Sequence, residues 1–244
     1  MGLLAGVTHF FGALGMLITS PSLIIRAMIP AGVALGLSLL VMSYGVGHSE
    51  QLLAWLSPEA ETGSMMSEVF TWSSYLLMGL LSLIVTPLLM ILFGIPLCEP
   101  LAGRAHDMLG GEDKGPPFVD SLILGVTLGI KVVVITLVGS AALFIIGFIP
   151  PLGLVTAPFA LLIWTPFWLC FDLCDAVHCR AGLSFSERVT LLRGSLLESV
   201  SVGLVAAFLV SPPFINLIGL PIAVLMGTRY ARELEVKAAR SSAS

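Results

Sequence analysis

Four long apolar blocks without charged residues make up most of this chain of 244 residues. They cover residues 27–47, 69–98, 132–171 and 199–228. A bilayer core about 30 Å thick needs about 20 helical residues to cross, because each residue advances a helix by about 1.5 Å. The first block therefore predicts one transmembrane helix, and the second predicts one long or tilted transmembrane helix.

The third and fourth blocks differ because a Pro-Pro pair interrupts each of them near the middle. The interruptions of the third block are Pro150, Pro151, Gly153 and Pro158. Those of the fourth block are Pro212, Pro213, Asn216, Gly219 and Pro221. Proline removes a backbone donor and clashes with the preceding turn, so each block should fold as two shorter helices around a non-helical apex. The halves of the fourth block are short for complete crossings and predict a hairpin that dips partway into the membrane.

Shorter segments surround these blocks. Residues 9–20 predict an amphipathic interfacial helix that ends before Pro21. Residues 101–109 predict a short helix, and residues 186–198 predict a second surface helix. The tail from about residue 236 should be frayed.

Composition supports a membrane protein, since 57% of the residues are hydrophobic and 11% are charged. Soluble domains have about 25% charged residues. The fold class expected for residues 1–244 is a single all-α integral membrane domain. It should have two long transmembrane helices plus two Pro-broken helical hairpins that penetrate the membrane partly, with short interfacial helices. The formal net charge of -4 argues against a nucleic-acid partner.

The distribution of charge predicts the orientation. The loop between the first two blocks has no basic residue but contains Glu50, Glu59, Glu61 and Glu68. All eleven Lys and Arg residues lie in the other segments. By the positive-inside rule the acidic loop should be external and both termini cytoplasmic.

One short segment collects most of the potential metal ligands. It contains Cys170, Asp172, Cys174, Asp175, His178 and Cys179. Structural zinc sites prefer Cys-x2-Cys pairs on turns, whereas this spacing places the cysteines along a helix. We interpret the segment as packing at a helix end and keep a metal site as the alternative. The fourth cysteine, Cys98, is distant in the sequence, and the pattern does not indicate a disulfide framework.

The sequence does not contain a recognisable catalytic set. His106 and Asp107 are neighbours, but adjacent residues on a helix point in different directions. Gly-x-Ser-x-Gly, His-Glu-x-x-His and Walker patterns are absent. We therefore expect neither an enzyme nor a cofactor, with an intramembrane enzyme as a third-ranked alternative.

Five segments, in order, resemble the CysZ/EI24 family. They are residues 21–30, 99–109 and 149–158, Cys174-Asp175 followed by Phe185 and Glu187, and residues 213–228. The resemblance implies two long transmembrane helices plus helical pairs that penetrate partway, often assembled from several subunits. It also implies sulfate transport, because bacterial CysZ members are sulfate permeases that feed cysteine synthesis.

The expected anion site departs from the family pattern. Where the family has Gly-Leu-Arg-Arg, or close to it, this chain has Ser22, Leu23, Ile24 and Ile25, followed by Arg26. Proteins bind sulfate with a helix N-terminus, free backbone N–H groups and ideally Arg. We predict an anion site from the amides of residues 22–25 and Arg26; alternatively, Arg26 anchors the first span at the interface. The family's basic stretch before the third block is reduced to Lys131.

The two Pro-broken hairpins look alike and predict a substrate path, because interrupted helices expose backbone groups inside the membrane. The predicted pore or apex residues are Pro150, Gly153, Pro158, Pro213, Asn216 and Pro221. Alternatively, Pro and Gly simply pack in membrane helices. Asn216 offers a neutral amide to a permeating anion or satisfies backbone groups freed by Pro212 and Pro213.

The leading hypothesis is a CysZ-like permease or channel for an inorganic anion, sulfate first, working as a homo-oligomer in the lipid of the cell inner membrane. The alternative is a non-transporting EI24-type membrane scaffold or assembly protein. The missing Arg pair favours the scaffold, whereas the paired hairpin apices favour transport.

Overall fold

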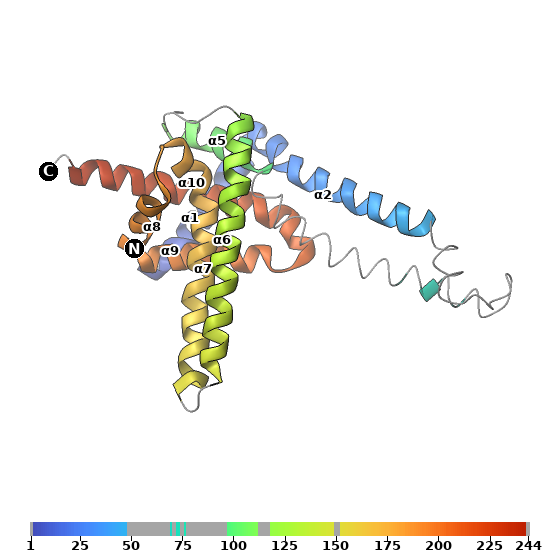
Figure 1. Ribbon diagram of the computed structural model, residues 1–244. Helices are drawn as coiled ribbons and strands as arrows, with labels where there is room; N and C mark the ends of the chain where they lie inside the picture. Colours follow the sequence, from blue (N-terminus) through green and yellow to red (C-terminus); the bar gives the residue numbers. More distant parts are fainter. Residues whose placement is uncertain are drawn as a thin grey trace.

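The computed structural model describes residues 2–47, 97–111, 118–148 and 152–242, together with Val69, Trp72, Ser73 and Leu76. Every regular element within these residues is helical (Figure 1). The chain is an all-α membrane protein, which confirms the predicted fold class. The acidic loop and almost all of the predicted second transmembrane helix lie outside the described residues.

Two helices form the N-terminal part. α1 covers Ala5–Thr19 after a 3-10 turn at Gly2–Leu4, and α2 covers Pro21–Gly47. Ser20 between them is extended, as expected for a residue before proline, so the predicted break is confirmed. α2 contains the whole first apolar block and runs away from the other helices (Figure 1).

A long hairpin is made by α6, Phe118–Gly147, and α7, Leu152–Arg180. The helices end and begin on either side of the predicted Pro-Pro break. The further breaks predicted at Gly153 and Pro158 are wrong, because both residues lie inside α7. Gly153 packs its backbone against the Ile146 carbonyl, and the single hydrogen bond that Pro158 removes is a loss that membrane helices tolerate.

Both helices of this hairpin are long enough to cross a bilayer. α6 and α7 have 30 and 29 residues, or about 45 Å each, which exceeds a bilayer core of about 30 Å. Thr127–Gly147 and Thr156–Arg180 are also apolar enough to cross a membrane. The prediction that this hairpin penetrates the membrane only partly is therefore not supported by the length of its helices.

The second hairpin is made by α9, Leu196–Val210, and α10, Pro213–Ser242. α9 has 15 residues, about 22 Å, which is short for a full crossing. The prediction that both halves of the fourth block are short is wrong for the second, because α10 has 30 residues. The breaks predicted at Asn216, Gly219 and Pro221 are wrong, since α10 continues through all three. Proline is tolerated in a first helical turn, where Pro213 lies, because its missing N–H would be unpaired there anyway. α10 also continues to Ser242, so most of the tail that was predicted to fray from about residue 236 is helical.

Two short helices connect the longer ones. α5 covers Glu99–Met108, close to the prediction of residues 101–109. The predicted surface helix over residues 186–198 is instead two elements, because α8 covers Phe185–Gly194 and the chain bends by 99° into α9. A capping box between Ser184 and Glu187 starts α8.

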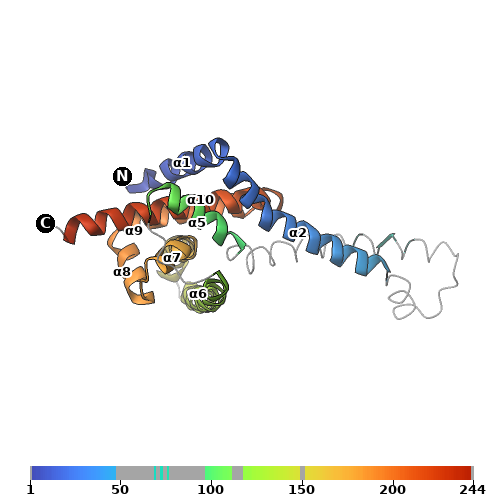
Figure 2. The ribbon, with the colours of Figure 1, turned by 90° about the horizontal axis from the view of Figure 1, so that it is seen from above.

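The core lies where α1, α7, α9 and α10 meet. Its largest fully buried side chains include Phe171, Leu225, Met226 and Tyr230. The aromatic rings of Trp168, Phe171 and Phe185 also contact one another. In Figure 2, α6 and α7 are seen end-on while α10 crosses the picture, so α10 runs across the long hairpin.

The far half of the long hairpin exposes apolar side chains. They include Phe144, Ile145, Phe148, Phe159, Leu162 and Ile163. The hairpin projects beyond the core (Figure 1), so these side chains form the surface that lipid would cover in a membrane protein.

Candidate functional site

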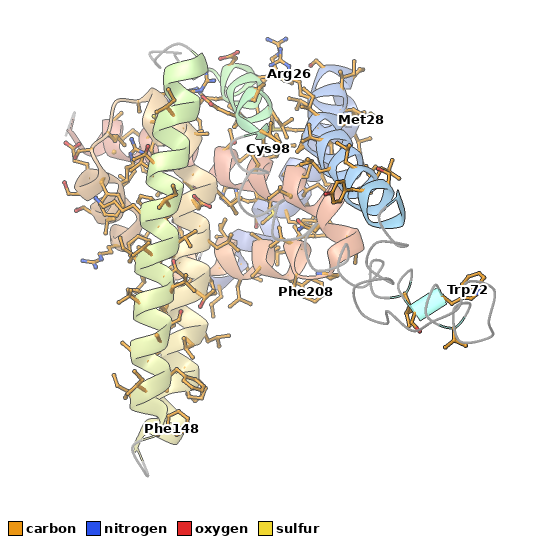
Figure 3. All side chains as sticks on the ribbon, turned by 45° about the vertical axis from the view of Figure 1, so that its right-hand side comes forward. Arg26, Met28, Trp72, Cys98, Phe148 and Phe208 are labelled. Atoms are coloured by element: carbon orange, nitrogen blue, oxygen red, sulfur yellow. The ribbon has the colours of Figure 1, made fainter. Side chains whose placement is uncertain are left out.

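Arg26 and the tip of the long hairpin lie at opposite ends of the molecule. Figure 3 shows Arg26 and Cys98 at one end and Phe148 at the other. α5 lies at the Arg26 end, beside the start of α6 (Figure 1). This end is the one that the charge distribution predicts to be cytoplasmic.

Arg26 joins the first turns of α2 to α5. Its Nη1 donates a hydrogen bond of 2.9 Å to the carbonyl oxygen of Pro100, and the side chain is half-buried. A guanidinium has five N–H donors, and in the described part of the chain this is the one partner that Arg26 has. The contact orients the side chain and leaves donors for an anion, although it also suits the alternative role as an interfacial anchor.

The backbone amides predicted to assist Arg26 are mostly engaged. The amides of Leu23 and Ile24 both donate to the carbonyl oxygen of Ser20, at 2.9 and 3.2 Å. Ile25 lies in the next helical position, where its amide pairs with the Pro21 carbonyl. Of the four predicted amides, the geometry leaves Ser22 for a ligand. Leu23 is fully buried, whereas the Ile24 and Ile25 side chains are exposed.

Asn216 lies in the second turn of α10, close to the apex of the α9–α10 hairpin. Its side chain is 3% exposed, and its Oδ1 has no hydrogen-bond partner in the described residues. Its own backbone N–H donates to the Pro212 carbonyl at 2.9 Å. A buried amide with an open acceptor fits a polar position within an apolar hairpin, and Pro221 is buried one turn further on.

The apices of the two hairpins do not come together within one chain. In Figures 1 and 2 the tip of the α6–α7 hairpin and the turn between α9 and α10 lie apart and point in different directions. Gly153 lies near the first tip, Pro158 is exposed further along α7, and Pro150 lies outside the described residues. The chain therefore does not unite Arg26, Gly153 and Asn216 in one pocket.

Lys131 has an internal role. Its ammonium group lies 4.2 Å from the centre of the Phe185 ring, in a cation–π contact between α6 and the start of α8. This contact adds to the aromatic cluster around Trp168. Lys131 thus helps hold α8 against the long hairpin.

Ion pairs that sequence reasoning missed surround the end of α7. Arg188 on α8 pairs with Asp175 on α7, and both side chains are buried. Arg180 lies 3.8 Å from Glu99 on α5, and its guanidinium packs over Gly103, where a Cβ atom would approach within 2.5 Å. Buried charges require partners, which is the signal that could have linked Asp175 with a basic residue.

A second polar group joins α5 to α10. Nε2 of His106 lies 3.4 Å from Oε2 of Glu235, and the same oxygen accepts a 2.9 Å bond from Arg232. Arg232 also donates to the carbonyl oxygens of Leu109 and Gly110. The pair of His106 and Asp107 considered as catalytic is thus divided, because His106 faces α10 while Asp107 is exposed.

The cysteines are packed rather than clustered on the surface. All four are free and buried, and Cys170 and Cys174 belong to the main core. The Cys174 thiol donates to the Gly227 carbonyl at 3.4 Å. In the described ranges, three or more His, Cys, Asp or Glu side chains do not group as a metal site would require. These contacts support the packing interpretation of the segment around Asp172.

The helices, the exposed apolar hairpin and the ion-paired end define a multi-pass, all-α membrane protein. Residues 9–221 match the protein family described as sulfate transporter CysZ/etoposide-induced protein 2.4. The chain belongs to this family, which confirms the resemblance found in the sequence. The description of the family names a sulfate transporter, CysZ.

Curated relatives agree with the family. Proteins named sulfate transporter CysZ from three strains of Vibrio cholerae serotype O1 are each 26% identical to this chain over 185 residues. The matched part covers 71% of this chain and 73% of the relative.

Proposed function

We propose that this protein is a membrane permease or channel that passes an inorganic anion, sulfate first, without ATP. The observation that carries the proposal is the half-buried Arg26 at the start of α2, with one carbonyl contact and further donors to spare. Membership of the CysZ/EI24 family and the name of the Vibrio cholerae relatives support sulfate as the ion. Uptake would serve cysteine synthesis.

Arg26 and the Ser22 amide would receive the anion at the cytoplasmic end. A charged guanidinium forms stronger hydrogen bonds to an oxyanion than a neutral donor does, and a helix N-terminus adds a partial positive charge. The buried Asn216 would act as a neutral polar position in the α9–α10 hairpin. No catalytic step or cofactor is required for such passage.

A homo-oligomer belongs to the proposal. Because the two hairpin apices lie apart in one chain, a path that uses both would combine elements of neighbouring copies (Figure 1). The exposed apolar side chains of α6 and α7 provide the surface for lipid or for such a neighbour. The protein would lie in the cell inner membrane with both termini cytoplasmic.

A non-transporting scaffold of the EI24 type is the second candidate. It is favoured by the replacement of the family's Arg pair and by the engagement of the Leu23 and Ile24 amides with Ser20. A scaffold does not need free donors at this position.

Sulfate flux into proteoliposomes separates the two candidates. Purified full-length protein is reconstituted, and uptake of radiolabelled sulfate is compared with that of protein-free liposomes and of proteoliposomes given labelled succinate as a larger dianion. A permease gives saturable sulfate uptake well above both controls. Absence of uptake at millimolar sulfate would contradict the permease proposal and favour the scaffold.

A further inference from the structure

Arg229 on α10 has a poorly compensated positive charge. Its Nη1 donates to the thioether sulfur of Met16 at 3.3 Å, and its Nε is buried without a partner. A thioether is a weak acceptor that cannot neutralise a guanidinium. In the described residues Arg229 has no carboxylate within ion-pair distance, although the side chain is half-buried. Removing a charge from water without such compensation is unfavourable.

The nearest acidic groups on α10 already have other partners. Glu233 lies one turn after Arg229, but its two oxygens contact Lys237 at 2.8 Å and His9 at 3.3 Å. Lys237 also pairs with Glu198 on α9, at 3.0 Å. These contacts raise the pKa of Lys237, with the Glu233 hydrogen bond as the largest cause. The local carboxylates therefore do not serve Arg229.

The backbone of α1 is shaped around this guanidinium. A Cβ atom on Gly12 would lie 2.5 Å from Cζ and 2.6 Å from Nε of Arg229. Gly15, one turn away on the same helix, has open space around its own Cβ position. Gly12 is partly exposed and Gly15 is exposed. The Arg229 side chain is also partly exposed, so a ligand can reach the guanidinium from solvent beside Gly12.

We propose that Arg229, with Gly12 and Met16 of α1, forms a binding site for a tetrahedral oxyanion. The ligand is either a free inorganic oxyanion or the phosphate of a lipid headgroup, since both offer the planar pair of acceptors that a guanidinium prefers. The site lies between α1 and α10 and is separate from Arg26. It does not depend on the chain being a permease.

The test uses full-length protein with Arg26→Ala as background, so that Arg26 cannot contribute. Sulfate is titrated calorimetrically at low ionic strength. Retention of phosphatidylglycerol is measured by native mass spectrometry after release from nanodiscs that contain phosphatidylglycerol and phosphatidylcholine. Arg229→Gln should weaken the binding of one of the two ligands by roughly ten- to a hundredfold. Arg229→Lys should weaken that binding less, because lysine keeps the charge.

Gly12→Ala and Gly15→Ala provide a matched pair that retains the arginine. Gly12→Ala should weaken the same ligand, because its Cβ displaces the guanidinium, whereas Gly15→Ala should match the background protein. Loss of sulfate binding alone identifies a free oxyanion, and loss of phosphatidylglycerol retention alone identifies a headgroup. Unchanged binding of both ligands in Arg229→Gln and Gly12→Ala overturns the site. If Arg229→Gln fails to fold, judged by gel filtration, the glycine pair decides.

Discussion

Gly203 of α9 lies directly against the carbonyl oxygen of Pro166 in α7. A Cβ atom on Gly203 would overlap that oxygen and approach the Pro166 carbonyl carbon and Cα as well. The two helix backbones are therefore in van der Waals contact at this point. Such close approach is typical of small residues at membrane helix interfaces.

Gly203→Ala should destabilise the fold, since backbone atoms cannot move aside as a flexible side chain can. Overpacking of this kind costs about 1–3 kcal/mol, or a fall in melting temperature of at least about 2–4 °C. Thermal unfolding followed by intrinsic fluorescence measures the effect. Gly129→Ala on α6 is the control, because its Cβ position has open space. Equal melting temperatures for the two variants would show that α7 and α9 do not pack this closely.

Removing one partner of the buried pair between Asp175 and Arg188 should be severe. Arg188→Gln leaves a buried carboxylate without its cation, and breaking a buried pair costs about 3–5 kcal/mol. The double variant with Asp175→Asn and Arg188→Gln should lose less stability than the sum of the losses in the two single variants. Arg193→Gln, an exposed position on the same helix, should stay near the unmodified protein. Additive losses would argue against a direct pair.

Arg26→Ala should weaken sulfate binding by roughly ten- to a hundredfold, because a hydrogen bond to a charged group contributes about 1.5–3 kcal/mol. Arg26→Lys should lose less, since it keeps the charge without the planar fork. Isothermal titration or radiolabelled uptake provides the measurement, with Arg193→Ala as the exposed control. If the protein transports sulfate and Arg26→Ala is silent, the anion site lies elsewhere, and Asn216 and Lys131 become the next positions to change.

Cysteine labelling tests the predicted orientation. Ser64→Cys, in the acidic loop, should react with an impermeant maleimide in intact spheroplasts, whereas Ser244→Cys should react only after lysis. Both positions lie outside the described residues. The four native cysteines are buried, so background labelling should be low. Equal labelling of the two variants in intact spheroplasts would indicate insertion in both orientations.

Some helix ends were predictable from the sequence because prolines act locally. α1 ends at Thr19, before Ser20 and Pro21, and α6 and α7 lie on either side of the Pro150-Pro151 pair. The same local rule failed at Pro158 and Pro221, which lie inside long helices. Pro158 is exposed and Pro221 is buried, so both surroundings allow a proline inside a membrane helix. A proline by itself therefore does not mark a helix end.

The candidate site was less predictable. The position of Arg26 was evident from the sequence, but its partner Pro100 lies 74 residues away, and the pairing depends on how α5 docks. The same holds for Asp175 with Arg188, because α8 must fold back on α7. The divergence of the two hairpin apices depends on helix crossing directions, which apolar blocks without charge do not specify.

The docking of α1 has a consequence for synthesis on the ribosome. The Gly6 amide donates to the Ser201 hydroxyl, which is 195 positions later in the chain, and α1 packs on both α9 and α10. At roughly 5–20 residues per second, α1 waits on the order of 10–40 s after translation before its partners emerge. During that interval its buried His9 and Ala13 have neither α9 nor α10 to cover them. The first helix to be made is therefore among the last to reach its place, and chains that stop before α9 release it undocked.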